Sequence, residues 1–338
     1  MNEPVSTGSP ELDKMLEGGF PTSSLVQLFG LKALGKSILS FQTAVKNVSQ
    51  GRSSIIVDTE LGYLNNVIPH WLKPFGERFG CDARVVKVGI QKTYDDAKKK
   101  RSSEAFLREA FSNVLRQVQV TPTDQELTDA LNIFAPNLQL AAEKADEPCV
   151  YVIEAPSLVD LLSLHGLKVE ILVSEGGRVE VRLQPHGLSD PKFSPLGRFV
   201  TERKASFVVY DSISAPMKAV FAGTQDLPAR SSSLALLLGQ VQRICNAIGV
   251  SVLAINHITV HPINPAWSHP YGGLIVGYDF KYVFHLEKAP SESKLEEVPL
   301  TNPGAKGDGN RLVWAYRHPR LEEYGSACLL RLDEDGFN

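Results

Sequence analysis

The hydrophobic positions of this chain fall into short runs that alternate with amphipathic stretches. Two stretches, residues 38–48 and 234–247, carry apolar residues at helical spacing. Short continuous apolar runs are typical of strands buried on both faces, so the alternation predicts an α/β fold, with a mainly parallel central sheet and helices on both faces. The runs that we interpret as its strands are residues 24–29, 54–57, 150–153, 207–210 and 250–255.

Three other segments depart from this alternation. Residues 91–148 are polar with a mostly helical pattern, whereas residues 167–197 hold two alternating runs around Gly176 and Gly177, which predicts a β-hairpin. We interpret both segments as internal insertions. Near the C-terminal end, apolar runs without helical stretches between them predict three strands of an antiparallel extension, at residues 282–286, 312–317 and 327–332.

Composition changes this picture little, but it excludes several classes of protein. Apolar residues make up 43% and charged residues 22%, which excludes a disordered or fibrous chain. The 35 basic and 38 acidic residues give a net charge of −3, so any site for a polyanion must be local. No apolar run is long enough to cross a membrane, and the start of the chain is unlike a secretory signal, so we expect a cytoplasmic protein. The four cysteines form no CxxC pair and are interpreted as buried thiols.

The strongest chemical signal lies between the first predicted strand and the helix after it. Residues 30–37 fit the pattern G-x-x-x-x-G-K-[ST], and the strand, loop and helix context is what this pattern requires. Gly30 and Gly35 let backbone N–H groups face phosphate oxygens at the positive end of a helix. In such a loop Lys36 neutralises the β and γ oxygens, and the Ser37 hydroxyl is a Mg²⁺ ligand. The sequence therefore predicts binding of ATP and Mg²⁺.

Two carboxylates that follow other predicted strands complete this candidate site. Asp211 ends the fourth strand, where a carboxylate can hold the metal, and Glu60 follows the second strand, where it can polarise a water for attack on the γ-phosphate. The competing interpretations are an Asp that opens a turn and a solvated loop Glu. Leu34, a bulky residue directly before Gly35, leaves the loop little room and predicts weakened nucleotide affinity.

Further segments match one family in order along the chain. Residues 6–19 (STGSPELDKMLEGG) are similar to a signature ahead of the phosphate loop, residues 58–60 (DTE) to a catalytic motif and residues 210–212 (YDS) to a metal-site strand. Residues 256–257 (NH) fall on an N-Q step, and residues 318–323 (HPRLEE) on a segment that caps a neighbour's adenine. Together these motifs resemble the RecA-like recombinases, specifically the archaeal and eukaryotic RadA branch with its RadB-like and RadC-like paralogues.

The resemblance implies a fold and a set of site residues. The fold is a single RecA-like P-loop ATPase domain over residues 1–338, with the insertions described above; the long stretch between Glu60 and Asp211 agrees with an addition inside one core. Catalysis is assigned to Glu60 as base, to Lys36, and to His257, which stands where the family has a switch Gln. The metal ligands are Ser37 and Asp211. The nucleotide contacts are Gly30, Leu31, Lys32, Ala33, Leu34, Gly35, Lys36, Ser37, Ile38 and Pro319.

The two DNA loops of the family look altered in this chain. Residues 258–271 contain no Lys or Arg, and a loop without cations contributes little affinity for a phosphate backbone. Aromatic side chains in this loop are able to stack on unpaired bases, although packing on a protein partner or on the chain's own sheet is an equally weighted alternative. The basic cluster 98–101 supplies the missing cations or is a solvated helix face. The candidate DNA contacts are Lys218, Arg230, Trp267 and Tyr271.

The leading interpretation is a slow, DNA-stimulated ATPase that acts as an accessory paralogue in homologous recombination and DNA repair. Its expected partners are single-stranded DNA and the main recombinase or other paralogues, with nucleoid association if the source is archaeal. The cap-like segment predicts a homo-oligomer through the nucleotide interface. The family's N-terminal helical domain is not expected here, because its signature starts at residue 6. Its F-x-x-A linker is not expected either, since residues 41–44 (FQTA) match those letters but lie on the predicted helix after the phosphate loop. The alternative is a KaiC-like nucleotide-binding scaffold or signalling protein in which ATP controls protein assembly without DNA.

Overall fold

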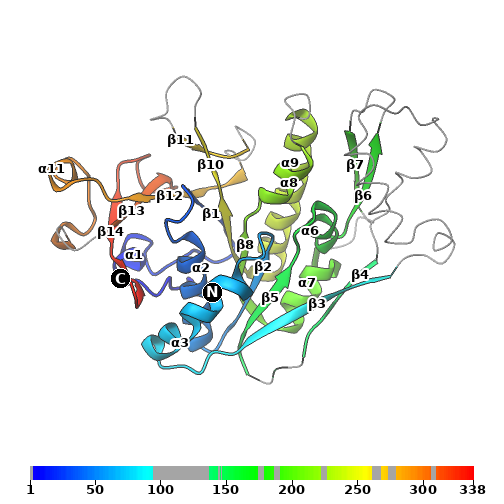
Figure 1. Cartoon of the computed structure of the whole chain (residues 1–338), viewed down its shortest axis with the longest axis horizontal. Helices are drawn as coiled ribbons and strands as arrows, with labels where there is room; N and C mark the ends of the chain where they lie inside the picture. The colour runs from blue at the N-terminus through cyan, green and yellow to red at the C-terminus, as the bar shows by residue number, and fades with distance from the viewer. Residues whose placement is uncertain are drawn as a thin grey trace.

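A ten-stranded sheet runs through the part of the chain that the computed structural model describes (Figure 1). Its strand order is β14-β13-β12-β1-β9-β8-β2-β5-β3-β4. The strands from β12 to β3 in this order are parallel, whereas β4, β13 and β14 run antiparallel to their neighbours. The described residues are 3–93, 137–143, 145, 147–173, 179–185, 191–221, 227–260, 268–272, 279–305 and 310–338.

The predicted strands are present, each with bounds within two residues of the apolar run that indicated it. The mainly parallel α/β sheet with antiparallel C-terminal strands is thereby confirmed. The strands of the sheet are β1 (Leu25–Gly30), β2 (Ser53–Asp58), β3 (Val85–Thr93), β4 (Asn137–Ala141), β5 (Val150–Glu154), β8 (Ala205–Asp211), β9 (Ser251–Asn256), β12 (Tyr282–Lys288), β13 (Arg311–Arg317) and β14 (Ala327–Leu330).

Helices cover both faces of this sheet, as expected from its apolar strands. One face packs against α1 (Pro10–Met15), α2 (Lys36–Ser49) and α3 (Ile68–Phe79). The other packs against α6 (Leu158–Leu164), α7 (Pro195–Glu202), α8 (Ala215–Val220) and α9 (Leu227–Ile244). Short helical turns are η1 (Tyr63–Val67), η2 (Pro191–Phe193), η4 (Cys245–Gly249), α11 (Glu292–Leu295) and η5 (Pro303–Ala305).

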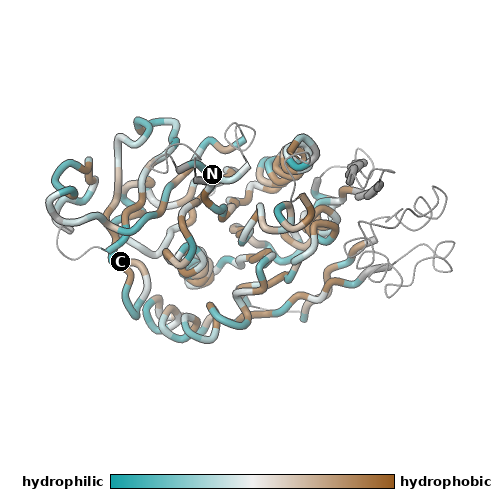
Figure 2. Tube along the Cα trace, turned by 45° about the horizontal axis from the view of Figure 1, so that its top comes forward, coloured by the Kyte–Doolittle hydropathy of each residue, from teal (hydrophilic) through white to brown (hydrophobic). Residues whose placement is uncertain are grey.

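Alternation along β1 shows how one strand serves two cores. Leu25 and Phe29 belong to the core under α6 to α9, whereas Val26 and Leu28 belong to the core under α1 to α3. Successive side chains of a strand point to opposite faces, so a strand covered on both sides is mostly apolar; Gln27 is the buried polar exception in β1. Figure 2 shows hydrophobic residues as brown tube in the middle of the molecule. Phe41 on α2 is fully buried, as expected for a core position.

The structure corrects three details of the sequence interpretation. The expected helical insertion 91–148 is wrong at its two ends, because residues 91–93 lie in β3 and residues 137–141 form β4, which pairs with it. The rest of that insertion from 94 to 136, with the basic cluster 98–101, lies outside the described residues. The C-terminal strands are not all antiparallel, since β12 runs parallel to β1, and the short helix α11 lies between β12 and β13.

In the part of the chain that the structure describes, three two-stranded sheets lie outside the main one. Within 167–197, β6 (Leu167–Val173) and β7 (Val179–Pro185) form an antiparallel hairpin. The strands β10 (Ile258–Val260) and β11 (Ser268–Pro270) pair after β9, and β15 (Leu332–Asp333) pairs with β16 (Gly336–Phe337) near the end of the chain. Among the described residues, no helix has the length and apolarity that a bilayer crossing requires.

Candidate functional site

The phosphate loop lies between the carboxyl end of β1 and the first turn of α2. A side chain at Gly30 has no room, because a Cβ there would lie 2.2 Å from the Leu286 carbonyl oxygen. Gly35 has φ +101°, in the left-handed region that favours glycine. Both glycines of the motif are thus explained by backbone geometry. Leu34, the bulky residue before Gly35, is half-buried against the core under α1 to α3.

The Lys36 side chain folds back over the loop. Its Nζ donates hydrogen bonds to the carbonyl oxygens of Gly30 at 3.0 Å and Leu31 at 2.6 Å. Burial lowers the pKa of Lys36, and the nearby carboxylates of Asp211 and Glu60 act in the opposite direction. An ammonium group therefore lies at the centre of the loop, where β and γ phosphate oxygens would meet it.

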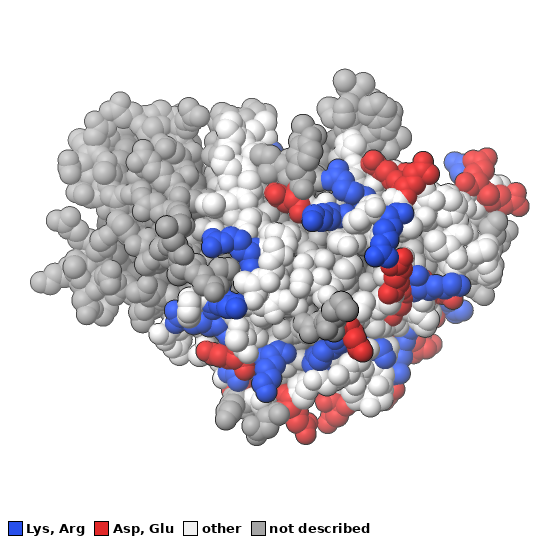
Figure 3. Space-filling view, turned by 180° about the vertical axis from the view of Figure 1, so that it is seen from behind, with Lys and Arg blue, Asp and Glu red and all other residues white. Residues whose placement is uncertain are grey.

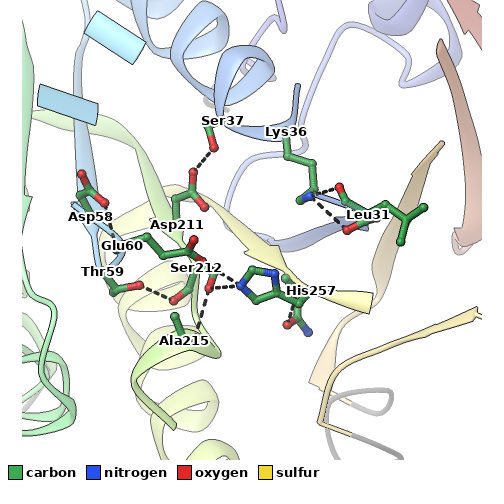
Figure 4. A network of polar contacts seen from close by, with 12 residues as sticks. Leu31, Lys36, Ser37, Asp58, Thr59, Glu60, Asp211, Ser212, Ala215 and His257 are labelled. Atoms are coloured by element: carbon green, nitrogen blue, oxygen red, sulfur yellow. Dashed lines mark hydrogen bonds and ion pairs between the residues drawn. The ribbon is translucent and has the colours of Figure 1, made fainter. Parts of the chain in front are cut away.

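Ser37 and Asp211 meet across the loop (Figure 4). The Ser37 hydroxyl donates to Asp211 Oδ2 at 2.5 Å, joining the start of α2 to the end of β8. Burial raises the pKa of Asp211 to about 6, the Ser37 hydrogen bond lowers it, and the charges of Glu60 and Asp58 raise it further. A hydroxyl and a carboxylate oxygen are hard ligands that suit Mg²⁺. A cation here would relieve the burial of negative charge, so these residues fit the metal.

Glu60, His257 and Ser212 form a second group at the same sheet edge (Figure 4). His257 Nε2 lies 2.7 Å from Glu60 Oε1 and 3.1 Å from Ser212 Oγ. The hydrogen bond from His257 lowers the pKa of Glu60 to about 2, against the effect of burial. The Glu60 and Ser212 oxygens both contact the same imidazole nitrogen of His257. In a catalytic triad, by contrast, the nucleophile and the carboxylate contact different nitrogens of the imidazole ring. The group is therefore unlike a serine hydrolase triad and suits a carboxylate that orients water.

Backbone contacts hold these strand ends together. Asp58 accepts hydrogen bonds from the backbone N–H groups of Glu60 at 3.1 Å and Tyr63 at 2.8 Å. Thr59 donates from its hydroxyl to the Ser212 carbonyl oxygen and from its N–H to the Asp211 carbonyl oxygen. The site residues expected from the sequence did not include Asp58, Thr59, Tyr63 or Ser212, although all but Tyr63 lie within the matched motifs 58–60 and 210–212.

Three of the four candidate DNA contacts lie together. Lys218 Nζ is 4.1 Å and Arg230 Cζ 4.8 Å from the centroid of the Tyr271 ring, and Arg230 donates to the Tyr271 hydroxyl at 2.7 Å. Tyr271 is also joined to the sheet edge that carries His257, since its N–H donates to the His257 carbonyl oxygen and its own carbonyl accepts from Asn256. The cations from α8 and α9 thus meet the loop that follows His257.

The positions of the remaining predicted site residues are as follows. Trp267 lies outside the described residues. Ile38 is half-buried on the first turn of α2, and Lys32 is exposed on the loop. Pro319 lies exposed in the turn after β13, beside Arg320, which forms an ion pair with Glu17. The role expected for Pro319 concerns a neighbouring chain.

Two family models match the chain, and each matched segment contains part of the site. The model described as ATPase: KaiC matches residues 5–120, which hold the phosphate loop and Glu60. The model described as Rad51 matches residues 193–301, which hold Asp211 and His257. The chain is a member of the RecA-like recombinase superfamily. The resemblance drawn from the motifs is confirmed.

Curated recombinases are similar to this superfamily member over different lengths. The DNA repair and recombination protein RadB of Methanoculleus marisnigri is 41% identical over 56 residues, which cover 17% of this chain and 25% of RadB. The DNA repair and recombination protein RadA of Haloquadratum walsbyi is 21% identical over 314 residues, 90% of this chain and 72% of RadA. The DNA repair protein rhp51 of Schizosaccharomyces pombe is 27% identical over 103 residues, 29% of this chain and 28% of rhp51.

Proposed function

We propose that this RecA-like chain is an ATPase that acts in DNA recombination and repair as an accessory to a main recombinase. The observation that carries the proposal is the meeting of Ser37 and Asp211 beside the Lys36 ammonium, with Glu60 at the same sheet edge. Phosphoryl transfer depends mostly on positioning and on charge stabilisation, and these four side chains provide both. The names of the RadA, RadB and rhp51 relatives support recombination and repair as the setting.

The protein groups have separate roles in the proposed reaction. The loop N–H groups and Lys36 bind and orient the phosphates, and Ser37 with Asp211 would hold Mg²⁺. When bound, Mg²⁺ supplies a positive charge that offsets the charge on the phosphates. Glu60 orients the attacking water, and the His257 side chain fixes the Glu60 carboxylate through their 2.7 Å contact. Because that contact keeps Glu60 ionised, the carboxylate accepts a hydrogen bond from water over the physiological pH range.

Single-stranded DNA is the polymer that we propose for the loop after His257. Lys218 and Arg230 are two described cations that contact this loop, both through Tyr271. Basic and acidic side chains are interspersed over the face seen in Figure 3, which agrees with a local DNA site. Two local cations predict weak binding with a shallow salt dependence, as suits an accessory protein.

A specific observation favours a second candidate function. The Tyr271 ring is covered by Lys218 and its hydroxyl is bonded to Arg230, so the ring that we expected to stack on bases is already engaged within the protein. The match of residues 5–120 to the model described as ATPase: KaiC fits the same alternative. In that alternative ATP orders a protein interface and DNA plays no part.

One pair of measurements tests the proposal. ATP hydrolysis is followed with and without Mg²⁺ and single-stranded DNA, and labelled single-stranded DNA is titrated by fluorescence anisotropy across a salt series. We expect Mg²⁺-dependent hydrolysis, stimulation by DNA, and DNA affinity that falls with salt. A chain that hydrolyses ATP but binds no DNA even at low salt would support the scaffold instead, above all if ATP changes its mass in solution. A chain that binds no ATP contradicts both candidates.

A further inference from the structure

The hairpin β15–β16 packs against the phosphate loop from outside the site. A Cβ on Gly35 would lie 2.9 Å from both the Leu332 and the Phe337 side chains, so these two side chains rest directly on the Gly35 backbone. Phe337 is fully buried. The loop glycine that takes the left-handed conformation therefore has its outer surface covered by the hairpin.

Hydrogen bonds fix the hairpin to α2, the helix that begins at the loop. The Gln42 side chain accepts from the Phe337 N–H at 2.7 Å and donates to the Phe337 carbonyl oxygen at 2.9 Å. Arg78 on α3 donates to the same carbonyl oxygen at 3.0 Å and to the Asp335 carbonyl oxygen at 2.8 Å. Phe337 is thus held at both of its backbone polar groups, and its ring has a fixed position against Gly35.

A second contact reaches the loop from the same end of the chain. Arg311, at the start of β13, donates from Nε to the Leu34 carbonyl oxygen at 3.0 Å. The neighbouring Asn310 exchanges two 2.9 Å hydrogen bonds with the backbone of Leu332. Leu34 and Gly35, the two residues before the motif lysine, are therefore restrained together by β13 and by the hairpin.

We propose that Phe337, Leu332 and Arg311 are positioning residues that fix the nucleotide-binding conformation of the phosphate loop. A glycine backbone is not restrained by a side chain of its own, and binding costs less when the loop already has the bound geometry. The three residues supply that restraint at Leu34 and Gly35 without touching the phosphates. The inference rests on the proposed nucleotide site.

The first test compares buried phenylalanines. Phe337→Ala is matched with Phe20→Ala, because Phe20 is also buried in the core under α1 to α3 but stacks on Phe207 of β8 instead. We expect Phe337→Ala to raise the Kd for a fluorescent ADP analogue about tenfold, Phe337→Leu to restore most of the affinity, and Phe20→Ala to leave the Kd within about twofold. Thermal unfolding is recorded for each variant, since both alanine variants lose core packing.

A second pair avoids large losses of core packing. Arg311→Gln removes the donor to Leu34, and Arg84→Gln removes an exposed arginine that pairs with Glu143, away from the hairpin. Only Arg311→Gln should weaken nucleotide binding. Hydrogen exchange of residues 30–37 is measured without nucleotide, and it should speed up in Phe337→Ala and Arg311→Gln but not in Phe20→Ala or Arg84→Gln.

The outcomes separate the two proposals. The positioning role would be overturned if the nucleotide Kd changed equally in each variant and its control. It would also be overturned if hydrogen exchange of residues 30–37 did not change. If the wild-type chain binds no nucleotide, the proposed function is wrong, while loop exchange still decides whether the three residues fix the loop.

Discussion

His257 Nε2 and Glu60 Oε1 lie 2.7 Å apart, although they belong to the ends of two strands that do not pair with each other. The contact fixes the Glu60 carboxylate and lowers its pKa to about 2. Two predictions concern the two sides of this contact.

Glu60→Gln should retain ATP binding and lose turnover by about a hundredfold or more, because the amide cannot accept a proton from the attacking water. The measurements are steady-state hydrolysis and nucleotide Kd. The control is Glu77→Gln, an exposed glutamate on α3 whose ion pair is with Lys73. Normal hydrolysis by Glu60→Gln would show that another group orients the water.

Replacing His257 separates hydrogen bonding from packing. His257→Leu should lower turnover about tenfold, because Glu60 loses the donor that fixes it. His257→Gln should stay within about threefold of wild type, because its amide reaches the same partners. Hydrolysis rates and nucleotide Kd are compared for both variants. Equal loss in both would indicate that the imidazole ring itself is required.

Ser37→Ala should raise the Mg²⁺ concentration that half-saturates hydrolysis about tenfold, because one proposed ligand is removed from beside the Asp211 carboxylate. Hydrolysis is measured across a Mg²⁺ series. Ser49→Ala, at the far end of the same helix, should leave the Mg²⁺ dependence unchanged. An unshifted Mg²⁺ series for Ser37→Ala would remove Ser37 from the metal site.

Lys218→Gln and Arg230→Gln should each weaken binding of single-stranded DNA and reduce its log–log salt slope by about 0.7. Anisotropy titrations at several salt concentrations measure the slope. Arg243→Gln is the control, since Arg243 is exposed on the same helix as Arg230 but bonds Gln240. Slopes equal to wild type in both variants would place the DNA elsewhere on the chain.

Acid should destabilise the fold through two buried histidines. Burial lowers the pKa of His165 to about 3, and burial together with the nearby Lys36 lowers that of His285 to about 4. The unfolded chain takes up these protons below about pH 6.5, whereas the folded chain does not. The contribution of these two histidines to the free energy of unfolding therefore falls as the pH is lowered below about 6.5, by up to about 1.4 kcal/mol per pH unit for each histidine.

Urea unfolding between pH 7.5 and 5 measures this loss. His165→Gln should have a smaller slope against pH than wild type, and the exposed His70→Gln should have the same slope. Identical slopes for wild type and His165→Gln would show that His165 is accessible to protons in the folded chain.

The central sheet and the carboxylates at its edge could be predicted because each depends on local sequence. Asp211 directly follows an apolar run and Glu60 comes three residues after another, and the ends of parallel strands meet at one edge. Contacts between distant segments leave no such local signal. Neither the packing of Phe337 on Gly35 nor the position of Tyr271 between Lys218 and Arg230 follows from spacing or periodicity. The polar pattern of residues 91–148 likewise concealed β4, which pairs only at the edge of the sheet.

The contact between Gln42 and Phe337 also sets an order of events during synthesis. The two residues are 295 positions apart in the sequence, and the phosphate loop precedes Gln42. A nascent chain that has exposed β1 and α2 at the ribosome still lacks the hairpin that covers Gly35. Incomplete chains should therefore bind nucleotide more weakly than a chain whose residue 337 has left the exit tunnel and packed on Gly35.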